Sequence, residues 1–229
     1  MKTIGLIGGL TWLSTVEYYK LLNQLVNERL GGAEAAKVII YSVNFGDIKT
    51  LTVEDRWAEI AVLIIDAAQK LEKAGAECLL IGANTMHRIA PEIQAQISIP
   101  IIHVAEITGN AIAKMRFKTV ALLGTKFTMQ LPFYKEKLQE QCIETIIPNE
   151  EDIEYINNSI YAEMSLGKFL PTTKEAYLKI IDKLIARGAE GVILGCTEIP
   201  ILIQQNDCNI PTFDTTYLHA KAAVDFALQ

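Results

Sequence analysis

Short glycine-bounded apolar blocks recur in the same order in the two halves of the chain, and this repeat limits the folds open to it. The spacing between blocks changes by only a few residues from one half to the other. Composition alone does not produce three ordered matches, so we interpret them as an internal duplication. The matched pairs are Lys2–Gly8 with Lys118–Gly124, Gly75–Gly82 with Gly188–Gly195, and Ile99–Pro100 with Ile210–Pro211.

Apolar runs rich in β-branched residues alternate with longer helical patterns in both halves, which favours parallel sheets with helices on both faces. We expect two pseudo-symmetric α/β lobes, residues 1–103 with 211–229 and residues 104–210. Open parallel sheets bind ligands beyond the carboxyl ends of their strands. The active site is therefore expected in the cleft between the lobes.

The pattern also predicts the individual elements. The expected strands are Thr3–Ile7, Val38–Val43, Cys78–Ile81, Ile101–Val104, Thr119–Leu123, Cys142–Ile146, Val192–Leu194 and Thr212–Phe213. The expected helices are Ser14–Arg29, Glu54–Ala74, Phe133–Gln141, Asp152–Leu166, Thr173–Arg187 and Tyr217–Leu228. Ser14 or Thr15 is expected near the N-cap of the first helix.

Composition narrows the class of protein. A formal net charge of −6 does not favour nucleic-acid binding. The four cysteines show no disulfide or zinc spacing, and the three histidines form no metal motif. The segment Gly5–Gly9 lacks the dinucleotide-binding spacing. With no signal peptide or spanning segment, we expect a cytoplasmic enzyme, and the residues indicate no nucleotide, metal or membrane site.

The residues after two matched strands carry the candidate chemistry. Cys196 follows the strand Val192–Leu194, and nearby backbone N–H groups can lower the pKa of a thiol at such a position. Glu198 is expected to orient or assist it. The repeat places Ala83 in the equivalent position of the first lobe. Two proton-transfer groups, one for each face of an α-carbon, suit racemisation, but alanine cannot carry a proton.

Five segments that span the chain in order resemble the aspartate/glutamate racemase family, which works without pyridoxal phosphate. The resemblance implies two pseudo-symmetric α/β lobes, an acidic amino acid as substrate and a homodimer. Similarity is greatest to the branch that acts on L-aspartate and L-glutamate. The segments are Gly8–Thr15, Asn84–His87, Gly124–Met129, Gly195–Glu198 and Phe213–Thr216.

The chain departs from the family pattern at one catalytic position. Members of the family carry Cys-Asn-Thr in the first lobe and Gly-Cys-Thr in the second, whereas this chain has Ala83 in place of the first cysteine. Some members have threonine there. The intact surroundings favour an engineered removal of the acid/base group over a natural departure. We expect the chain to racemise poorly, with Cys196 as the remaining acid/base.

The resemblance also implies how the substrate is held. Backbone amides and hydroxyl groups near both catalytic positions bind it, and Gly8-Gly9 allows a close backbone approach. The anchor for the second carboxylate is left open between Thr52, at a position where some members use a polar or basic residue, and Lys168. The expected substrate-binding residues are Leu10, Thr11, Thr52, Asn84, Thr85, Thr125 and Thr197.

Two other functions remain open. Arylmalonate decarboxylases belong to the same superfamily and retain only the second-lobe cysteine, which protonates an enolate from one face. Ala83 together with Cys196 fits that arrangement. The other alternative is a non-catalytic protein that binds acidic amino acids, with Ala83 as its native residue.

Overall fold

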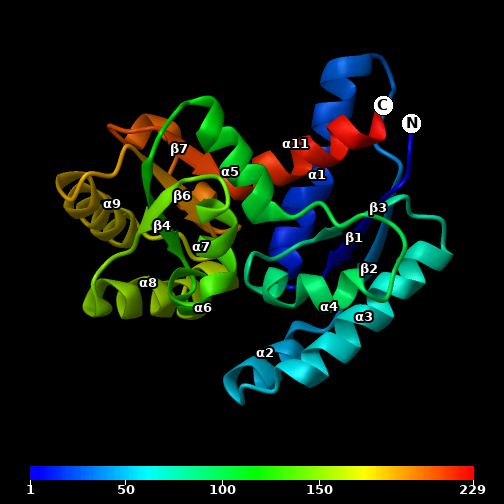
Figure 1. Cartoon of the computed structure of the whole chain (residues 1–229), viewed down its shortest axis with the longest axis horizontal. Coiled ribbons are helices and arrows are strands. Elements are labelled where there is room, and N and C mark those ends of the chain that lie inside the picture. The colour runs from blue at the N-terminus through cyan, green and yellow to red at the C-terminus, as the bar shows by residue number, and fades with distance from the viewer. The chain divides into compact units, whose positions relative to one another are not determined.

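The computed structural model describes residues 1–229 and divides into two compact units. Unit 1 comprises Met1–His103 with His219–Gln229, and unit 2 comprises Val104–Leu218. No helix is both long and apolar enough to cross a membrane. The expected α/β class with parallel sheets is confirmed, since each unit has one parallel sheet with helices packed against it (Figure 1).

Unit 1 is built on a three-stranded parallel sheet in the order β2-β1-β3. The central and third strands are buried along their whole length, as apolar strands covered on both faces should be. The helices α1 and α11 pack on one face, while α3 contacts all three strands. These elements are β1 (Ile4–Gly8), β2 (Val38–Ser42), β3 (Cys78–Ile81), α1 (Trp12–Leu30), α3 (Trp57–Lys73) and α11 (Thr215–Ala227), of which α11 belongs to unit 1 from His219 onward.

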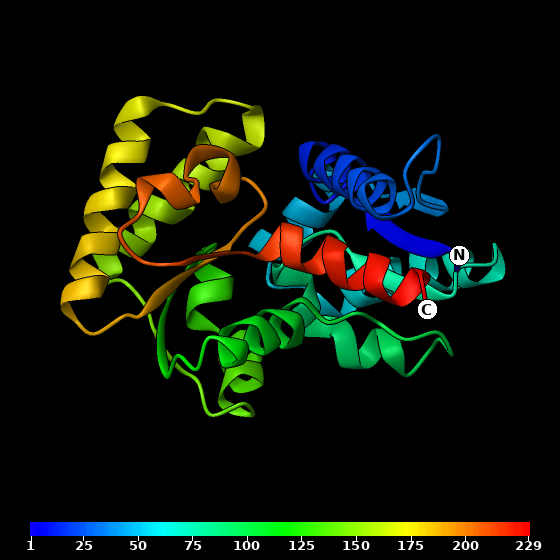
Figure 2. The same ribbon diagram turned by 90° about the horizontal axis from the view of Figure 1, so that it is seen from above.

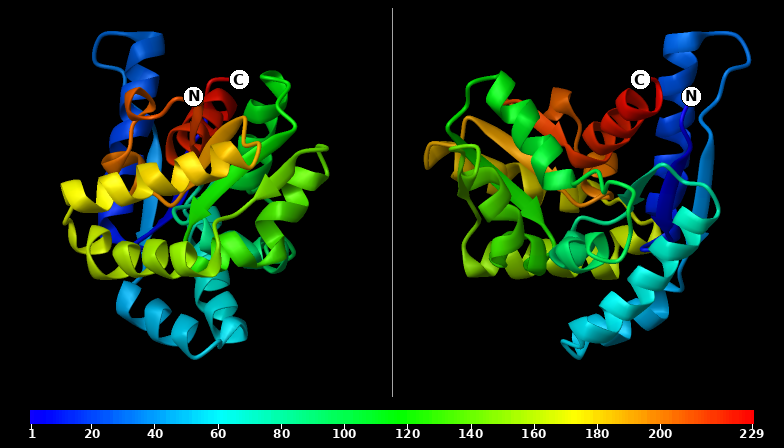
Figure 3. Two further views of the ribbon diagram at one scale, coloured as in Figure 1. Left: turned by 90° about the vertical axis from the view of Figure 1, so that its left-hand side faces the viewer. Right: turned by 45° about the vertical axis from the view of Figure 1, so that its right-hand side comes forward.

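Shorter helices complete unit 1 and follow the strand ends. The helix α2 packs against α3, and the right-hand view of Figure 3 shows this pair at one end of the unit. The two chain ends lie side by side, and the Lys2 N–H donates to the Ala227 carbonyl at 2.8 Å. The remaining elements are α2 (Phe45–Val53), η1 (Thr85–Ile89) and α4 (Ala90–Gln94).

Unit 2 has a four-stranded parallel sheet in the order β5-β4-β6-β7. The helices α8 and α9 pack on one face, and Figure 2 shows them along their length. The helices α5 and α7 cover the other face. The strands are β4 (Thr119–Gly124), β5 (Glu144–Ile146), β6 (Gly191–Gly195) and β7 (Thr212–Asp214). The helices are α5 (Val104–Lys114), α6 (Lys126–Gln130), α7 (Pro132–Gln139), α8 (Glu150–Ala162), η2 (Met164–Leu166), α9 (Pro171–Ala186), α10 (Ile199–Leu202) and η3 (Gln205–Asp207).

Matched residues of the repeat make matching contacts in the two units. In unit 1 the Glu77 carboxylate accepts the Thr3 N–H at 2.7 Å. In unit 2 the Glu190 carboxylate accepts the Thr119 N–H at 2.9 Å. The carbonyls of Pro100 and Pro211 likewise accept the N–H of Leu79 and Val192, both at 2.9 Å. The duplication read from the sequence therefore extends to individual hydrogen bonds.

The helix expected over Glu54–Ala74 is α3 (Trp57–Lys73), which begins slightly later than expected, and a separate helix, α2, precedes it. Asp55 adopts a positive φ of 55°, which no helical residue can have. This torsion separates α3 from α2 (Phe45–Val53), a segment for which the sequence pattern predicted no element. The N-cap of α1 is Thr11 instead of Ser14 or Thr15, and its hydroxyl accepts the Ser14 N–H.

Two expectations near the middle and end of the chain also differ from the structure. The strand expected over Ile101–Val104 is reduced to one bridge between Ile101 and Leu79, and α5 already starts at Val104. Residues 211–218 fall in unit 2, not with the first lobe as expected, because β7 hydrogen-bonds to β6. The Ile101 bridge on β3 is the counterpart of β7 on β6.

Candidate active site

Cys196, Thr197 and Glu198 form a buried polar turn at the carboxyl end of β6. The Cys196 thiol donates to the Glu198 Oε2 atom at 2.9 Å, and the Thr197 hydroxyl donates to the same oxygen at 2.7 Å. Glu198 is only 3% exposed. Gly195 precedes the thiol because a Cβ there would lie 2.7 Å from the Leu123 carbonyl oxygen. The turn thus holds a thiol and a carboxylate in direct contact.

The electrostatics of this turn differ from the sequence-based expectation. Burial raises the pKa of the Cys196 thiol well above its usual range, and the charge of the neighbouring Glu198 carboxylate raises it further. The backbone N–H groups of Thr197 and Glu198 lower the pKa of the thiol, as the sequence suggested, but burial and the Glu198 carboxylate outweigh them. Cys196 rests as a protonated thiol whose proton points to a carboxylate, an arrangement that can give or pass on a proton.

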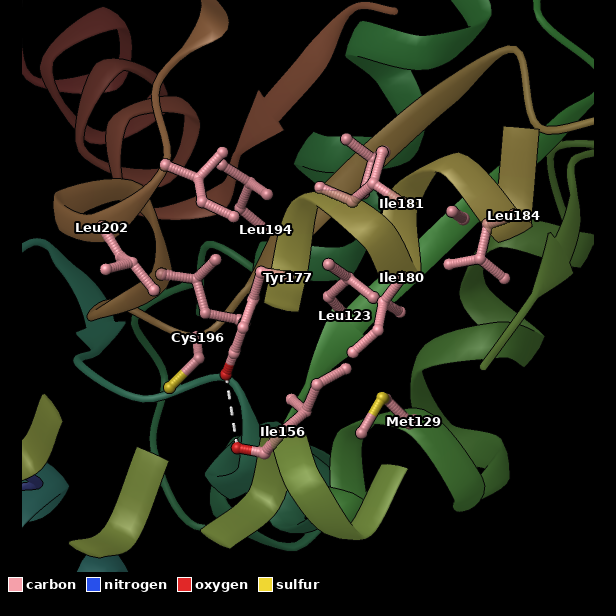
Figure 4. Packing of buried hydrophobic residues seen from close by; sticks show 14 of the residues in the cluster. Leu123, Met129, Ile156, Tyr177, Ile180, Ile181, Leu184, Leu194, Cys196 and Leu202 are labelled. Carbon is pink, nitrogen blue, oxygen red and sulfur yellow. Dashed lines mark hydrogen bonds between the residues drawn. The ribbon is translucent and has the colours of Figure 1, made fainter. Parts of the chain in front are cut away.

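Two tyrosines lie near this thiol and were not found from the sequence. Figure 4 shows Cys196 beside the Tyr177 ring, at the margin of the apolar cluster of unit 2. The Tyr177 hydroxyl donates to the Ile156 carbonyl at 3.3 Å. Burial raises the pKa of Tyr161 on α8 to about 12, and the charges of Cys196 and Glu198 contribute. The sequence predicts a helix there but gives no sign that Tyr161 is close enough to Cys196 and Glu198 to feel their charge.

Thr125 stands at the end of the neighbouring strand, since Gly124 of β4 pairs with Gly195 of β6. Its hydroxyl caps α6 by accepting the Thr128 N–H at 3.3 Å and contacts the Thr128 hydroxyl at 3.1 Å.

Two side chains of helix α8 contact the turn that follows Thr125. The Asn157 amide oxygen accepts the Lys126 N–H at 2.9 Å, and Glu154 forms an ion pair with the Lys126 ammonium.

In unit 1, Leu10 and Thr11 lie in the turn after β1. Gly9 has a φ of 77°, and a Cβ there would lie 2.1 Å from the Val43 carbonyl oxygen. Only glycine fits this backbone. The Thr11 hydroxyl contacts the Ser14 hydroxyl at 2.9 Å while it caps α1. Leu10 is 6% exposed and Thr11 is 7% exposed, so both are buried.

Ala83, Asn84 and Thr85 follow β3, which is the strand beside β1. Gly82 joins the two strand ends, because its N–H donates to the Ile7 carbonyl at 2.9 Å. Asn84 and Thr85 are buried, and Thr85 begins the short helix η1. The structure therefore brings Ala83–Thr85 to the same sheet edge as Leu10 and Thr11, as the parallel arrangement requires.

The two candidates for the second carboxylate anchor occupy different units. Thr52 lies on α2 of unit 1, is 7% exposed and donates its hydroxyl to the Ile48 carbonyl at 2.7 Å. That hydroxyl proton is therefore already used within the helix. Lys168 is an exposed residue in the segment between η2 and α9 of unit 2. No group of three or more His, Cys, Asp or Glu side chains could hold a metal ion.

In each unit, buried polar turns follow the central strands. The turn after β6 holds a thiol that is hydrogen-bonded to a carboxylate. Such a pair has the chemistry to give up and take back a proton. A family model described as Asp/Glu/Hydantoin racemase matches residues 7–223. The chain belongs to this Asp/Glu/hydantoin racemase family.

Individual relatives agree with the family match. The chain is 28% identical over 166 residues to the broad specificity amino-acid racemase RacX of Bacillus subtilis, covering 72% of this chain and 71% of the relative. A Yersinia pestis crystal structure described as a "putative Asp/Glu Racemase" is 43% identical with a TM-score of 0.93. PH1733 of Pyrococcus horikoshii OT3, an aspartate racemase homologue, is 35% identical with a TM-score of 0.88. Both structures are matched over 100% of each chain. These relatives support an amino-acid racemase function.

Proposed function

We propose that the chain acts on the α-proton of aspartate or glutamate, with Cys196 as the acid/base group for one face of the α-carbon. The observation that carries this proposal is the buried hydrogen bond between the Cys196 thiol and the Glu198 carboxylate, at 2.9 Å. A buried thiol beside a carboxylate has one acceptor for its proton and little competing water. Proton transfer needs both conditions in one place.

The thiol must become a thiolate before it can remove a proton. In the proposed step the S–H bond breaks and the proton moves to the Glu198 Oε2 atom, which then becomes a carboxylic acid. The Cys196 thiolate takes the α-proton and leaves a carbanion on the substrate. Return of a proton from the re-formed thiol gives back the original enantiomer, with hydrogen exchanged if the thiol has equilibrated with water.

Inversion needs a second group that delivers a proton to the other face, and position 83 is the repeat equivalent of Cys196. The methyl group of Ala83 has no proton to give. We therefore propose that this chain exchanges the α-proton of a bound amino acid but racemises it poorly. Supporting residues follow the family resemblance: Leu10, Thr11, Asn84, Thr85, Thr125 and Thr197 hold the substrate, with Thr52 as a further candidate.

Proton NMR in deuterated water tests this proposal. The chain is incubated separately with the L and D enantiomers of aspartate and glutamate, and the loss of the α-proton signal is compared with the change in enantiomer ratio. We expect exchange to exceed racemisation and to disappear in Cys196→Ala.

The same measurement tests the carboxylate. Glu198→Gln should slow exchange by about 100-fold, within the range for loss of one acid–base group. Glu190→Gln, which removes a carboxylate elsewhere in unit 2, is the matched control. Rapid racemisation by the unaltered chain would contradict the proposal.

A second candidate function follows from the protonation state of the thiol. Because the pKa of Cys196 is raised, the resting thiol is ready to protonate an enolate, which is what a one-cysteine decarboxylase requires. Release of carbon dioxide from arylmalonates, lost in Cys196→Ala, would favour that activity over racemisation. Binding of aspartate with no α-proton exchange, even in Ala83→Cys, would instead indicate a non-catalytic binding protein.

The oligomeric state, the location and the cofactor requirement that we propose also follow from the family resemblance. We propose a homodimer in the cytoplasm that needs no added cofactor and takes a small acidic amino acid as its partner. Sedimentation velocity of the purified chain measures the oligomeric state. Exchange activity that survives exhaustive dialysis against a metal chelator, without added pyridoxal phosphate, tests the cofactor proposal.

A further inference from the structure

All three histidines of the chain belong to unit 1, and their rings pack together below the turn that carries position 83. The ring centroids of His87 and His103 are 4.8 Å apart, and those of His87 and His219 are 5.4 Å apart. His87 is 1% exposed and His219 is fully buried. The sequence gives no reason to expect this cluster, because the three residues come from separate segments.

The hydrogen bonds of two of these histidines fix where their protons lie. Burial lowers the pKa of both His87 and His219 to about 3, so each ring is neutral and has one N–H. The Nε2 atom of His219 lies 2.6 Å from the Ile102 carbonyl and must donate to it. Its Nδ1 atom therefore accepts from the Tyr18 hydroxyl, at 2.8 Å.

His87 carries its proton on the other ring nitrogen. Its Nδ1 atom lies 3.0 Å from the Ala83 carbonyl oxygen, which can only accept, so Nδ1 is the donor. The Nε2 atom is then unprotonated, and it is buried without a hydrogen-bond partner. A buried acceptor without a donor costs stability. Packing alone would be better served by an apolar ring, so the feature of His87 that compensates is its Nδ1–H.

With the Nδ1–H of His87 as donor, both backbone polar groups of Ala83, the residue at the proposed proton-transfer position, are hydrogen-bonded. The Ala83 N–H donates to the Ile81 carbonyl at 2.8 Å, and the Ala83 carbonyl accepts from His87. The His87 backbone N–H also donates to the Asn84 carbonyl at 3.1 Å. His87 therefore holds residues 83 and 84 with its main chain and its side chain together.

We propose that His87 is the positioning residue of the unit 1 half of the site. Its Nδ1–H holds the carbonyl of residue 83 and so sets the direction in which the side chain at position 83 leaves the backbone. This inference rests on the proposed proton-transfer role of position 83. A misplacement of about 1 Å at a reacting group can cost on the order of 100-fold in rate, so one hydrogen bond to this carbonyl has a measurable effect.

The test compares side chains that keep or lose the donor. The amide nitrogen of asparagine is as many bonds from Cα as the histidine Nδ1, whereas the glutamine nitrogen matches Nε2. His87→Asn, His87→Gln and His87→Leu are therefore made in an Ala83→Cys background. We expect kcat for aspartate racemisation to stay within threefold in His87→Asn and to fall by ~10–100-fold in the other two. KM should change less than kcat. His219→Gln is the control, because it alters a neighbouring buried ring of the same cluster and leaves the His87 Nδ1–H in place, so it separates loss of the donor from disturbance of the cluster.

A structural readout keeps this test independent of racemase activity. Amide hydrogen exchange at residues 83–87 should stay slow in His87→Asn and become fast in His87→Gln and His87→Leu, with the rest of unit 1 unchanged. Nitrogen-15 NMR of the imidazoles should show Nδ1–H in His87 and Nε2–H in His219. Full kcat in His87→Leu, or equal losses in His87→Asn and His87→Leu, would overturn the proposal. If Ala83→Cys does not racemise at all, the proposed proton-transfer role of position 83 fails, and the hydrogen-exchange pattern alone decides the role of His87.

Discussion

The two units share one layout but carry different chemistry at matching places. In both, a glutamate accepts backbone N–H groups at the start of the central strand, and a threonine caps the helix that follows it. The turn after β6 then presents a thiol and a carboxylate, whereas the turn after β3 presents the methyl group of Ala83. Matched hydrogen bonds and helix caps are thus kept in both units, whereas the side chains at the two proposed proton-transfer positions differ.

The largest expected effect comes from making the two units alike at this one position. Ala83→Cys supplies the missing acid, and we expect racemisation of aspartate to rise by ~100–10,000-fold, the usual contribution of one positioned acid–base group. Circular dichroism or chiral chromatography of the amino acid follows the reaction. Ala83→Thr tests whether a hydroxyl suffices, and Ala83→Val is a control of similar bulk. An unchanged rate in Ala83→Cys, with α-proton exchange still present, would show that position 83 is not the second acid–base position.

The units should also differ in acid sensitivity, because His87 and His219 lie in unit 1 and unit 2 contains no histidine. In the folded chain the pKa of both is about 3, against about 6.5 in an unfolded chain. Above pH ~6.5 both states leave these rings neutral and stability is unaffected. As the pH falls from 6.5 towards 3, only the unfolded chain takes up protons, and stability is lost.

At pH 5 this linkage costs about 2 kcal/mol for each histidine. Both tryptophans, Trp12 and Trp57, lie in unit 1, so their fluorescence during urea unfolding reports that unit. We expect the free energy of unfolding to fall by about 4 kcal/mol from these two groups between pH 7.5 and pH 5. His219→Gln should remove about half of that fall. Equal pH dependence in the variant and the unaltered chain would refute the linkage.

Features that depend on the local sequence pattern or on the internal repeat could be predicted from the sequence. Glycine-bounded strands, their parallel pairing and the place of Cys196 after β6 all depend on neighbouring residues or on a comparison of the two halves. The contact between Cys196 and Glu198 is also local, since the two residues lie in one turn. These features follow from the sequence because few distant residues are needed to form them.

Features that depend on distant residues could not be predicted. The raised pKa of Cys196 comes mainly from burial by helices whose packing no local pattern describes. His219 comes shortly after β7 of unit 2 in the sequence, yet it bonds to Tyr18 and Ile102 in unit 1. The start of α3 was expected too early, at Glu54, because the positive φ of Asp55 leaves no trace in apolar periodicity. Burial, long-range partners and single backbone torsions are thus where the sequence alone was insufficient.

The smallest expected difference concerns the two matching helix caps. Thr11 caps the 19-residue α1, which covers one face of the unit 1 sheet, whereas Thr125 caps the five-residue α6. Loss of a threonine cap costs about 0.5–2 kcal/mol. We expect Thr11→Ala to lie near the upper end of this range and Thr125→Ala near the lower end, because fraying of α1 also loosens its packing on the sheet. Serine at either position keeps the hydroxyl and should recover most of the loss. Hydrogen exchange followed by mass spectrometry resolves the two units separately, and equal costs at the two caps would show that helix length does not matter here.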